Sequence, residues 1–196
     1  MNYLAHVYLS GENPQLALGN FIADHVKGKA YRDYPRGIQQ GILLHRFIDS
    51  YTDAHPNFKQ AAQLFFPTHR HYSRVLVDMY FDHLLARDWL HYHPKKPLPD
   101  FARDFYSVLN THIELLPKNF QKINRIIREQ DWFNGYARLP ELERILMHMD
   151  RRTRFDSQLQ ASVAVFKHIQ SDFEALFPPF FTDLRAATLE ERIRMS

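Results

Sequence analysis

Two acidic side chains and a histidine stand close together in the segment Asp78-Met79-Tyr80-Phe81-Asp82-His83. On a helix, residues four apart lie one above the other, so Asp78 and Asp82 share a face. Two carboxylates on one face repel each other unless a cation or a proton lies between them. The flanking residues are apolar, so these acids belong to a buried helix and require a partner. That partner is a metal ion or one of the arginines Arg46, Arg74 and Arg87.

A second pair with the same spacing is His45 and Asp49. It can supply two metal ligands, or one ligand and the carboxylate that orients it. The alternative is a surface pair that stabilises the helix by about 0.2–0.5 kcal/mol. Asp24 is another acid within an apolar segment. His6 stands alone, and a lone histidine is more often a buried structural residue than a ligand.

The recurrence of Asp and His within the first 83 residues makes a shared metal site as good an interpretation as four unrelated structural features. The 196-residue chain has no cysteine, which excludes disulfides, zinc–thiolate sites, iron–sulfur clusters and cysteine nucleophiles. Oxygen and imidazole ligands without sulfur favour Mn²⁺, Mg²⁺ or Fe²⁺ over a structural zinc ion.

The elements that must position these residues are helices. Apolar residues recur at helical spacing, and only six glycines occur in the whole chain. Prolines delimit the helices, with Pro67 closing one and Pro178-Pro179 separating the last two. We expect one all-α domain over residues 1–196, with helices near 36–52, 56–67, 70–92, 100–117, 119–134, 140–150, 157–177 and 182–194.

The rest of the sequence bounds the location and the partners. The N-terminus has no basic segment followed by an apolar run, and no stretch reaches the roughly 18–20 apolar residues of a membrane span. We therefore expect a cytoplasmic protein with no membrane partner. The net charge of +3 is mild, so nucleic acid is not expected. Basic runs at 27–36, 122–128 and 151–154 indicate an acidic macromolecule or a phosphorylated ligand, or else an ordinary solvated face.

Several of these motifs occur together in one order. Met1-Asn-Tyr-Leu-Ala-His6, 19–24, 45–49, 77–83 and Arg151-Arg152-x-Arg154 together resemble the acyl carrier protein phosphodiesterase family, also called acyl carrier protein hydrolase. The resemblance implies a helical bundle distantly related to HD-domain phosphohydrolases and dependent on Mn²⁺ or a similar ion. It also implies hydrolysis of holo-acyl carrier protein to the apo form, with release of 4′-phosphopantetheine.

The resemblance further implies roles for individual residues. HD enzymes carry an adjacent His-Asp doublet, whereas this chain has Asp24-His25 and Asp82-His83 in reversed order. The resemblance therefore does not decide which acidic residues bind the metal ion and which one acts as the base. Acyl carrier proteins are small and acidic, so the basic runs become docking surface. The implied metal ligands are His6, His45, Asp49, Asp78 and Asp82; the catalytic residues are Asp24, Asp78 and His83; the docking residues are Lys27, Lys29, Arg125, Arg128, Arg151, Arg152 and Arg154.

Two other functions remain open at this point. One is an HD-type phosphohydrolase that acts on a nucleotide or another small phosphodiester. The other is a non-enzymatic helical binding module whose Asp and His pairs are structural. The first predicts turnover of a small phosphodiester without a protein partner, and the second predicts little thermal shift on adding Mn²⁺.

Overall fold

The structure is a computed structural model that describes residues 1–118, 120–151 and 157–195. Helices dominate this part of the chain and it contains no strand, which confirms the predicted all-α class. The first helices are α1 (Tyr3–Leu9), α2 (Pro14–Ile22), η1 (Ala23–His25), η2 (Ala30–Asp33), α3 (Arg36–Ala54), α4 (Pro56–His69), η3 (Arg70–Tyr72) and α5 (Ser73–Arg87). They are followed by α6 (Trp89–Tyr92), α7 (Leu98–Thr111), η4 (Ile113–Leu115), α8 (Gln121–Glu129), α9 (Trp132–Gly135), α10 (Leu139–Asp150), η5 (Leu159–Ala161) and α11 (Ser162–Met195).

Prolines begin several of the helices. Pro14 and Pro56 lie in the first turns of α2 and α4, where a helix does not need the N–H group that proline lacks. Asn13 caps α2, because its side-chain oxygen accepts hydrogen bonds from the N–H groups of Gln15 and Leu16 at 3.0 and 3.1 Å. The start of α2 is therefore set by its local sequence.

Helices α2 and α3 pack unusually closely because glycines face each other where they cross. A Cβ on Gly19 would overlap the carbonyl oxygen of Ile38 and lie 2.9 Å from Gly41 Cα. A Cβ on Gly41 would overlap the carbonyl oxygen of Leu16 and lie 2.8 Å from the nitrogen of Asn20. Only glycine fits at both positions, so the backbone of α2 lies directly against α3.

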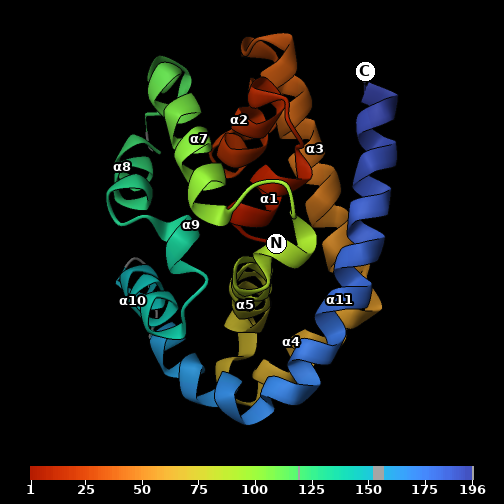
Figure 1. The fold of residues 1–196 in the computed structure, drawn as a ribbon, viewed down its shortest axis with the longest axis vertical. Coiled ribbons are helices and arrows are strands. Elements are labelled where there is room, and N and C mark those ends of the chain that lie inside the picture. The colour runs from red at the N-terminus through yellow and green to blue at the C-terminus, as the bar shows by residue number, and fades with distance from the viewer. Residues whose placement is uncertain (119, 152–156, 196) are drawn as a thin grey trace.

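A cluster of aromatic rings joins α4, α5 and α11. Phe81 of α5 has its ring centroid 5.2 Å from Phe173, 5.1 Å from Phe177 and 5.0 Å from Phe180. Phe58 of α4 lies 6.3 Å from Phe81, and all five rings are buried. In Figure 1, α11 passes below α5 and α4 and then rises beside α3. The cluster thus holds α5 in the interior, where it supports α1.

Two helix breaks expected at prolines do not occur. Pro67 lies inside α4, and Pro178 and Pro179 lie inside the single helix α11, so the predicted end at 67 and the separate helices 157–177 and 182–194 are wrong. Pro67 stands in the last turn of its helix, where little of the helix remains to be disrupted. At Pro178 and Pro179 the flanking Phe177 and Phe180 are buried in the aromatic cluster. Tertiary packing there outweighs the loss of backbone hydrogen bonds.

Two other predicted helices are interrupted. Instead of one helix over 70–92, α5 ends at Arg87 and α6 begins at Trp89. Instead of one helix over 119–134, α8 and α9 are separated at Asp131, whose φ of 47° is left-handed. Both sides of each interruption bury apolar residues, so the apolar pattern continues across it. The pattern alone therefore does not reveal the interruption.

None of the helices in the described ranges combines the length and the apolar character needed to cross a membrane.

Candidate metal centre

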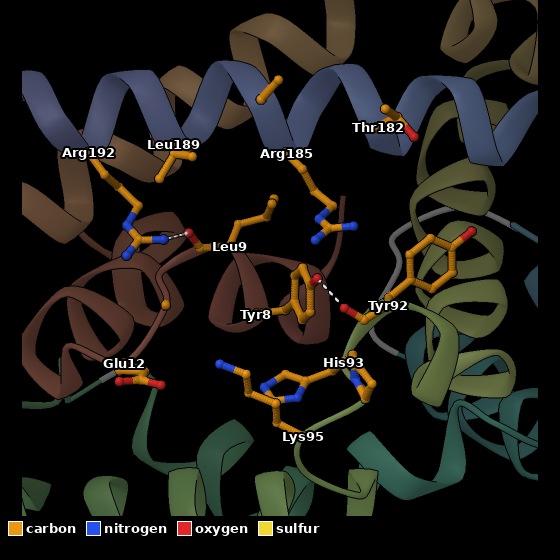
Figure 2. Close-up of a pocket in the computed structure, with 13 residues that line it drawn as sticks. Tyr8, Leu9, Glu12, Tyr92, His93, Lys95, Thr182, Arg185, Leu189 and Arg192 are labelled. Atoms are coloured by element: carbon orange, nitrogen blue, oxygen red, sulfur yellow. Dashed lines mark hydrogen bonds between the residues drawn. The ribbon is translucent and has the colours of Figure 1, made fainter.

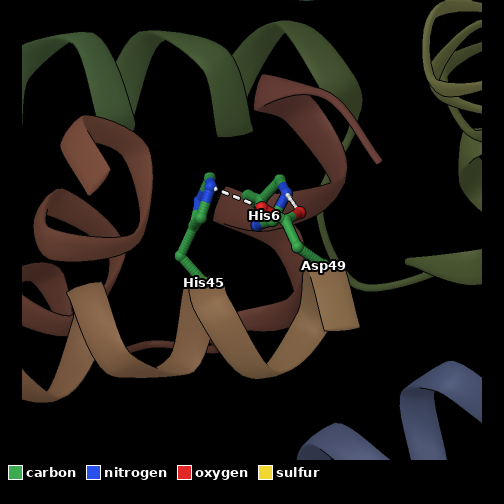
Figure 3. A group of neighbouring side chains, drawn as sticks. All are labelled: His6, His45 and Asp49. Carbon is green, nitrogen blue, oxygen red and sulfur yellow. Dashed lines mark ion pairs between the residues drawn. The ribbon is translucent and has the colours of Figure 1, made fainter. Parts of the chain in front are cut away.

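Three predicted ligands from two distant helices meet at one point. His6 comes from α1, and His45 and Asp49 come from successive turns of α3. One ligand atom of each residue lies within 4.8 Å of the ligand atoms of the other two. The carboxylate of Asp49 bridges the edges of the two rings, 3.2 Å from His6 Nε2 and 3.0 Å from His45 Nε2 (Figure 3). We call His6, His45 and Asp49 the His–His–Asp cluster.

The two imidazole rings of this cluster stack on each other. Their centroids are 4.1 Å apart with an angle of 18° between the planes. Both rings are almost fully buried, with side-chain exposures of 3% for His6 and 8% for His45. Parallel stacking directs both Nε2 atoms toward Asp49, which explains why one carboxylate reaches both.

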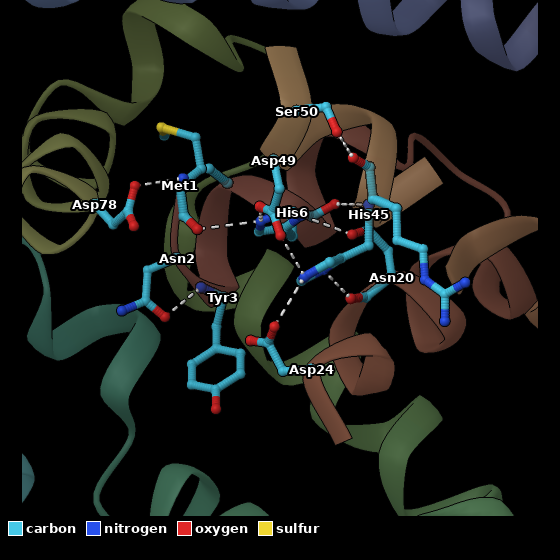
Figure 4. A network of polar contacts seen from close by, with 12 residues as sticks. Met1, Asn2, Tyr3, His6, Asn20, Asp24, His45, Asp49, Ser50 and Asp78 are labelled. Carbon is cyan, nitrogen blue, oxygen red and sulfur yellow. Dashed lines mark hydrogen bonds and ion pairs between the residues drawn. The ribbon is translucent and has the colours of Figure 1, made fainter. Parts of the chain in front are cut away.

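Asn20 of α2 holds both rings in orientation (Figure 4). Its side-chain amide donates to the carbonyl oxygen of His6 at 2.8 Å and to the hydroxyl of Ser10 at 2.9 Å, which leaves its Oδ1 as an acceptor. His6 Nδ1 lies 2.7 Å from that Oδ1, and His45 Nδ1 lies 2.8 Å from the backbone oxygen of Asn20. Both Nδ1 atoms therefore carry a proton and donate it, and metal-binding histidines are oriented in this way.

Asp24 joins the cluster from η1. Its Oδ1 lies 3.2 Å from His45 Nε2, the same nitrogen that Asp49 approaches. The side chains of Asp24 and Asp49 are 62% and 45% exposed, in contrast to the buried histidines. The cluster is therefore closed on the imidazole side and open to solvent on the carboxylate side.

The charges of the cluster follow from its hydrogen bonds. Burial acts to lower the pKa of His45, but hydrogen bonds to Asp24 and Asp49 outweigh it and raise the pKa to about 9. Burial alone would raise the pKa of Asp49, and the close contacts with His45 and His6 outweigh it, so this pKa is lowered. The hydrogen bond from His45 also lowers the pKa of Asp24. Without a metal ion, His45 is a protonated imidazolium between two carboxylates at neutral pH.

His6 is different, because burial and the neighbouring charge of His45 lower its pKa to about 4. A neutral His6 with its proton on Nδ1 has only a lone pair on Nε2. That lone pair faces Asp49 Oδ1 at 3.2 Å and the carbonyl oxygen of Met1 at 3.1 Å. A nitrogen this close to two oxygens needs either a proton on Nε2 or a cation between them, and the three donors of the cluster together fit a metal ion. Two imidazole nitrogens and carboxylate oxygens are suitable donors for Mn²⁺ or Fe²⁺.

Asp78 lies beside the cluster but faces a different partner. Its Oδ1 lies 2.6 Å from the amino group of Met1. Burial raises the pKa of Asp78, although the Met1 charge opposes this shift. The same ion pair, outweighing burial, raises the pKa of the Met1 amino group. Asp78 is thus linked to His6 through Met1 rather than placed among the three cluster residues.

Asp82 is fully buried and accepts hydrogen bonds from the start of α1. The backbone N–H groups of Asn2, Leu4 and Ala5 donate to its carboxylate at 3.2, 2.8 and 3.4 Å. Burial raises the pKa of Asp82 to about 7, against the opposing effects of the Met1 charge and these hydrogen bonds. Asp82 therefore anchors α1, the helix that carries His6.

His83 points to another part of the molecule. Its Nδ1 lies 2.6 Å from the backbone oxygen of Tyr136, and its ring stands edge-on to Phe166 with centroids 5.8 Å apart. Burial lowers the pKa of His83. The structure thus brings together His6, His45, Asp49 and Asp24, and it does not bring Asp82 and His83 into that group.

Sequence reasoning missed Asn20 as a functional residue. The signal was present, because Asn20 is a polar residue within the apolar run 16–23 and is fully buried. A buried asparagine requires hydrogen-bond partners. Its partners are histidines that lie 14 and 25 residues away along the chain, so the spacing gives no indication of the contact.

The predicted docking residues lie in separate places. Lys27 and Lys29 are exposed and follow Asp24 by three and five residues, so they lie on the segment that leaves the cluster. Arg151 is exposed at the end of α10. Arg152 and Arg154 lie outside the described residues.

The two basic residues of α8 have partners of their own. Arg125 is exposed and lies 3.8 Å from Glu129 on the same helix. Arg128 is partly buried and donates a hydrogen bond to the side chain of Asn110 on α7. Arg128 therefore has a structural contact as well as a charge.

Comparisons with known proteins agree with the resemblance noted in the sequence. The family model described as acyl carrier protein phosphodiesterase matches residues 1–184. A protein of that name from Yersinia pestis is 33% identical over 194 residues, which cover 98% of this chain and 100% of the relative. Another from Pectobacterium atrosepticum is 35% identical over 181 residues, 92% of this chain and 94% of the relative.

No solved structure matches the chain significantly, and the distant relation to HD-domain phosphohydrolases therefore stays a prediction. The family match covers nearly the whole chain, including every residue of the His–His–Asp cluster together with Asn20 and Asp24. This chain belongs to the acyl carrier protein phosphodiesterase family.

Proposed function

We propose that this chain hydrolyses the phosphodiester that joins 4′-phosphopantetheine to a serine of holo-acyl carrier protein, and that it requires a divalent metal ion. The observation that carries the proposal is the His–His–Asp cluster, which occurs in a chain whose relatives are named acyl carrier protein phosphodiesterase. Family membership supports an enzyme over the alternative of a non-enzymatic binding module.

His6, His45 and Asp49 would hold the metal ion through Nε2, Nε2 and a carboxylate oxygen. Mn²⁺ is our first choice, with Fe²⁺ or Mg²⁺ as alternatives, because the donors are imidazole and carboxylate without sulfur. The bound ion would supply a Lewis acid that polarises the phosphodiester and activates water. Asn20 keeps both Nδ1 atoms protonated, so both Nε2 lone pairs remain available as donors.

Asp24 is the residue to which we assign proton transfer. Its side chain is 62% exposed beside the cluster, and its lowered pKa keeps it ionised at neutral pH. An ionised carboxylate at the open side of the site can accept a proton from water, or orient that water. Asp78 and His83, which the sequence also suggested for catalysis, contact the Met1 amino group and the Tyr136 backbone instead.

The docking surface for the acidic carrier protein would begin at Lys27 and Lys29. Both side chains are exposed and lie three and five residues after Asp24, at the open side of the cluster. Charge reversal in Lys27→Glu/Lys29→Glu should raise KM for the carrier protein and make the activity less sensitive to salt, because the attraction that salt screens is removed. Arg151→Glu is the comparison that tests the end of α10. Unchanged KM in the double variant would exclude this docking surface.

The test of the proposed function is a direct measurement of the product. We would incubate the protein with holo-acyl carrier protein and either Mn²⁺ or EDTA, and follow the carrier protein by intact mass spectrometry. We expect the phosphopantetheine mass to be lost only with metal and not with Asp49→Asn. Asp53→Asn is the matched control, because Asp53 lies one turn further along α3 and pairs with Arg74 at 2.9 Å on the surface.

Two results would overturn the proposal in different ways. If the mass of the carrier protein stays constant with every metal tested, the substrate assignment is wrong. Turnover of a nucleotide or an aryl phosphodiester would then favour the alternative of a small-molecule phosphohydrolase. If turnover persists in EDTA and in Asp49→Asn, the reaction does not depend on the cluster.

A further inference from the structure

A cleft of about 680 Å³ lies away from the His–His–Asp cluster. One wall is the C-terminal half of α11, and the other is formed by the end of α1 with the chain that follows α6 (Figure 2). Tyr8, which lines the cleft, is two residues from His6 on α1. Residues two apart on a helix point about 200° apart, so Tyr8 and His6 face opposite sides. The cleft is therefore a separate site.

Cationic side chains reach this cleft from both walls. Arg185 and Arg192 lie seven residues, or about two turns, apart on α11 and point across the cleft in Figure 2. Lys95 approaches from the facing wall. Glu12 is the one carboxylate among the described lining residues. The excess of positive charge favours an anionic ligand.

The guanidinium group of Arg185 is available for such a ligand. It lies 5.7 Å from the ring centroid of Tyr8 and forms no ion pair with any residue in the described part of the chain. The Tyr8 hydroxyl donates to the backbone oxygen of Tyr92 at 2.8 Å, so the ring is fixed as the floor beneath Arg185. A guanidinium group that lies over a fixed aromatic ring can still bind one oxyanion through two parallel hydrogen bonds.

A second polar group on the opposite wall lacks a partner. His93 lines the cleft and its ring stacks on Trp89, with centroids 5.3 Å apart and planes 10° apart. Its buried Nδ1 has no hydrogen-bond partner among the described residues. A buried polar atom without a partner is destabilising, and this one lies in the wall of the cleft.

We propose that this cleft binds a small organic phosphate, with the phosphate between Arg185 and Lys95 and an apolar or aromatic body against Tyr8. Positive charge from both walls suits the double charge of a phosphate better than a single carboxylate. The walls between the charges are apolar, since Leu9, Ala186 and Leu189 lie there. A ligand with both a phosphate and a ring would use both kinds of surface.

The test uses phenyl phosphate and isothermal titration calorimetry on the metal-free protein in EDTA. We expect Arg185→Gln to raise the Kd for phenyl phosphate by about tenfold or more, since it removes a charged hydrogen-bond donor. Lys95→Gln should weaken binding in the same direction. Arg194→Gln is the matched control on α11, because Arg194 pairs with Glu191 at 3.2 Å on the surface, and it should leave the Kd unchanged.

Further arms separate the cleft from the His–His–Asp cluster and test the chemistry of the ligand. Binding of phenyl phosphate should survive in Asp49→Asn, and inorganic phosphate and benzoate should both bind more weakly than phenyl phosphate. No binding to the unaltered protein at millimolar concentration would overturn the proposal. So would equal Kd values for Arg185→Gln and the unaltered protein, loss of binding only in Asp49→Asn, or tighter binding of benzoate.

Discussion

Two regions of this molecule share one sequence pattern but make different contacts. On α3, His45 and Asp49 stand one turn apart, and on α5, Asp78 and Asp82 do the same. Among the residues that the structure describes, the ligand atoms of the α3 pair meet each other, His6 and Asp24, and the Asp49 carboxylate is partly exposed to solvent. The carboxylates of the α5 pair meet the Met1 amino group and three backbone N–H groups.

The difference shows that a spacing of four residues places two side chains on one helix face but does not determine which groups they contact. A carboxylate that accepts several N–H groups has its hydrogen-bonding capacity filled by the protein itself. A carboxylate that faces imidazole nitrogens and solvent keeps its capacity for a metal ion. The α5 pair thus holds α1 in place so that the α3 pair can meet His6.

The largest effect should come from the α3 pair. Asp49→Asn removes the carboxylate that joins both imidazoles, and we expect kcat/KM on holo-acyl carrier protein to fall by at least about 100-fold in saturating Mn²⁺. Steady-state kinetics beside Asp53→Asn would measure this. Retention of activity within about tenfold of the unaltered protein would show that Asp49 is not a ligand.

The α5 pair should respond in stability instead. Asp82→Ala leaves three buried N–H groups without their acceptor, and we expect the free energy of unfolding to fall by about 2–3 kcal/mol. Urea unfolding in EDTA measures this without any contribution from bound metal. If stability is unchanged while Mn²⁺ affinity is lost, Asp82 is a ligand, as the sequence suggested, and the contrast between the regions fails.

Asn20→Ala sharpens the comparison by leaving all three ligands in place. It removes the acceptor for His6 Nδ1, so we expect Mn²⁺ affinity to fall by about tenfold, with much of kcat regained at high metal concentration. Asn13→Ala is a control on the same helix. It removes the N-cap of α2 and should lower the free energy of unfolding by about 1 kcal/mol, without changing any contact of the cluster. Equal metal affinities in the two variants would show that Asn20 does not contribute to metal binding.

The smallest predicted effect is the release of one proton when the metal ion binds. Since the pKa of His45 is about 9 and that of His6 about 4, metal binding at pH 7.5 should displace about one proton, from His45. Calorimetry in two buffers with different ionisation enthalpies would count it. Metal affinity should therefore rise with pH up to about 9. Release of no proton would mean that His45 is already neutral in the metal-free protein.

The same shift has a consequence for the metal-free fold. The folded pKa of His45 lies above its ordinary value of about 6.5. Its contribution to stability is therefore complete below pH 6.5 and is lost as the pH rises through about 9. Urea unfolding in EDTA across this window should show a decrease that His45→Gln lacks.

Much of the fold follows from local patterns. Helical periodicity and prolines at helix starts predict α3, α4 and α10 to within two residues at each end, whereas α7 ends at Thr111, six residues before the predicted end at 117. The continuity of α11 through Pro178 and Pro179 does not follow locally, because it depends on burial of Phe177 and Phe180 against α4 and α5. Such packing overrides a local preference only once the partner helices are placed.

The site divides in the same way. His45 and Asp49 form a local pair that spacing can reveal. His6 and Asn20 join them through contacts that span 14 and 25 residues, and no periodicity encodes those. The family resemblance implied Asp82 as a ligand, and that role stays a prediction. Its backbone partners at the start of α1 lie 77 to 80 residues away, beyond what sequence spacing can show.

The glycine crossing of α2 and α3 gives the cluster an unusual mechanical character. The oxygen of Asn20 that holds His45 belongs to the backbone, and this backbone rests on Gly41 without an intervening side chain. Side chains can change rotamer, whereas two touching backbones can only move apart as rigid bodies. A methyl group added at residue 19 would therefore push α2 and α3 apart and change the distance between the Asn20 backbone and His45. It would not change the chemistry of any donor atom.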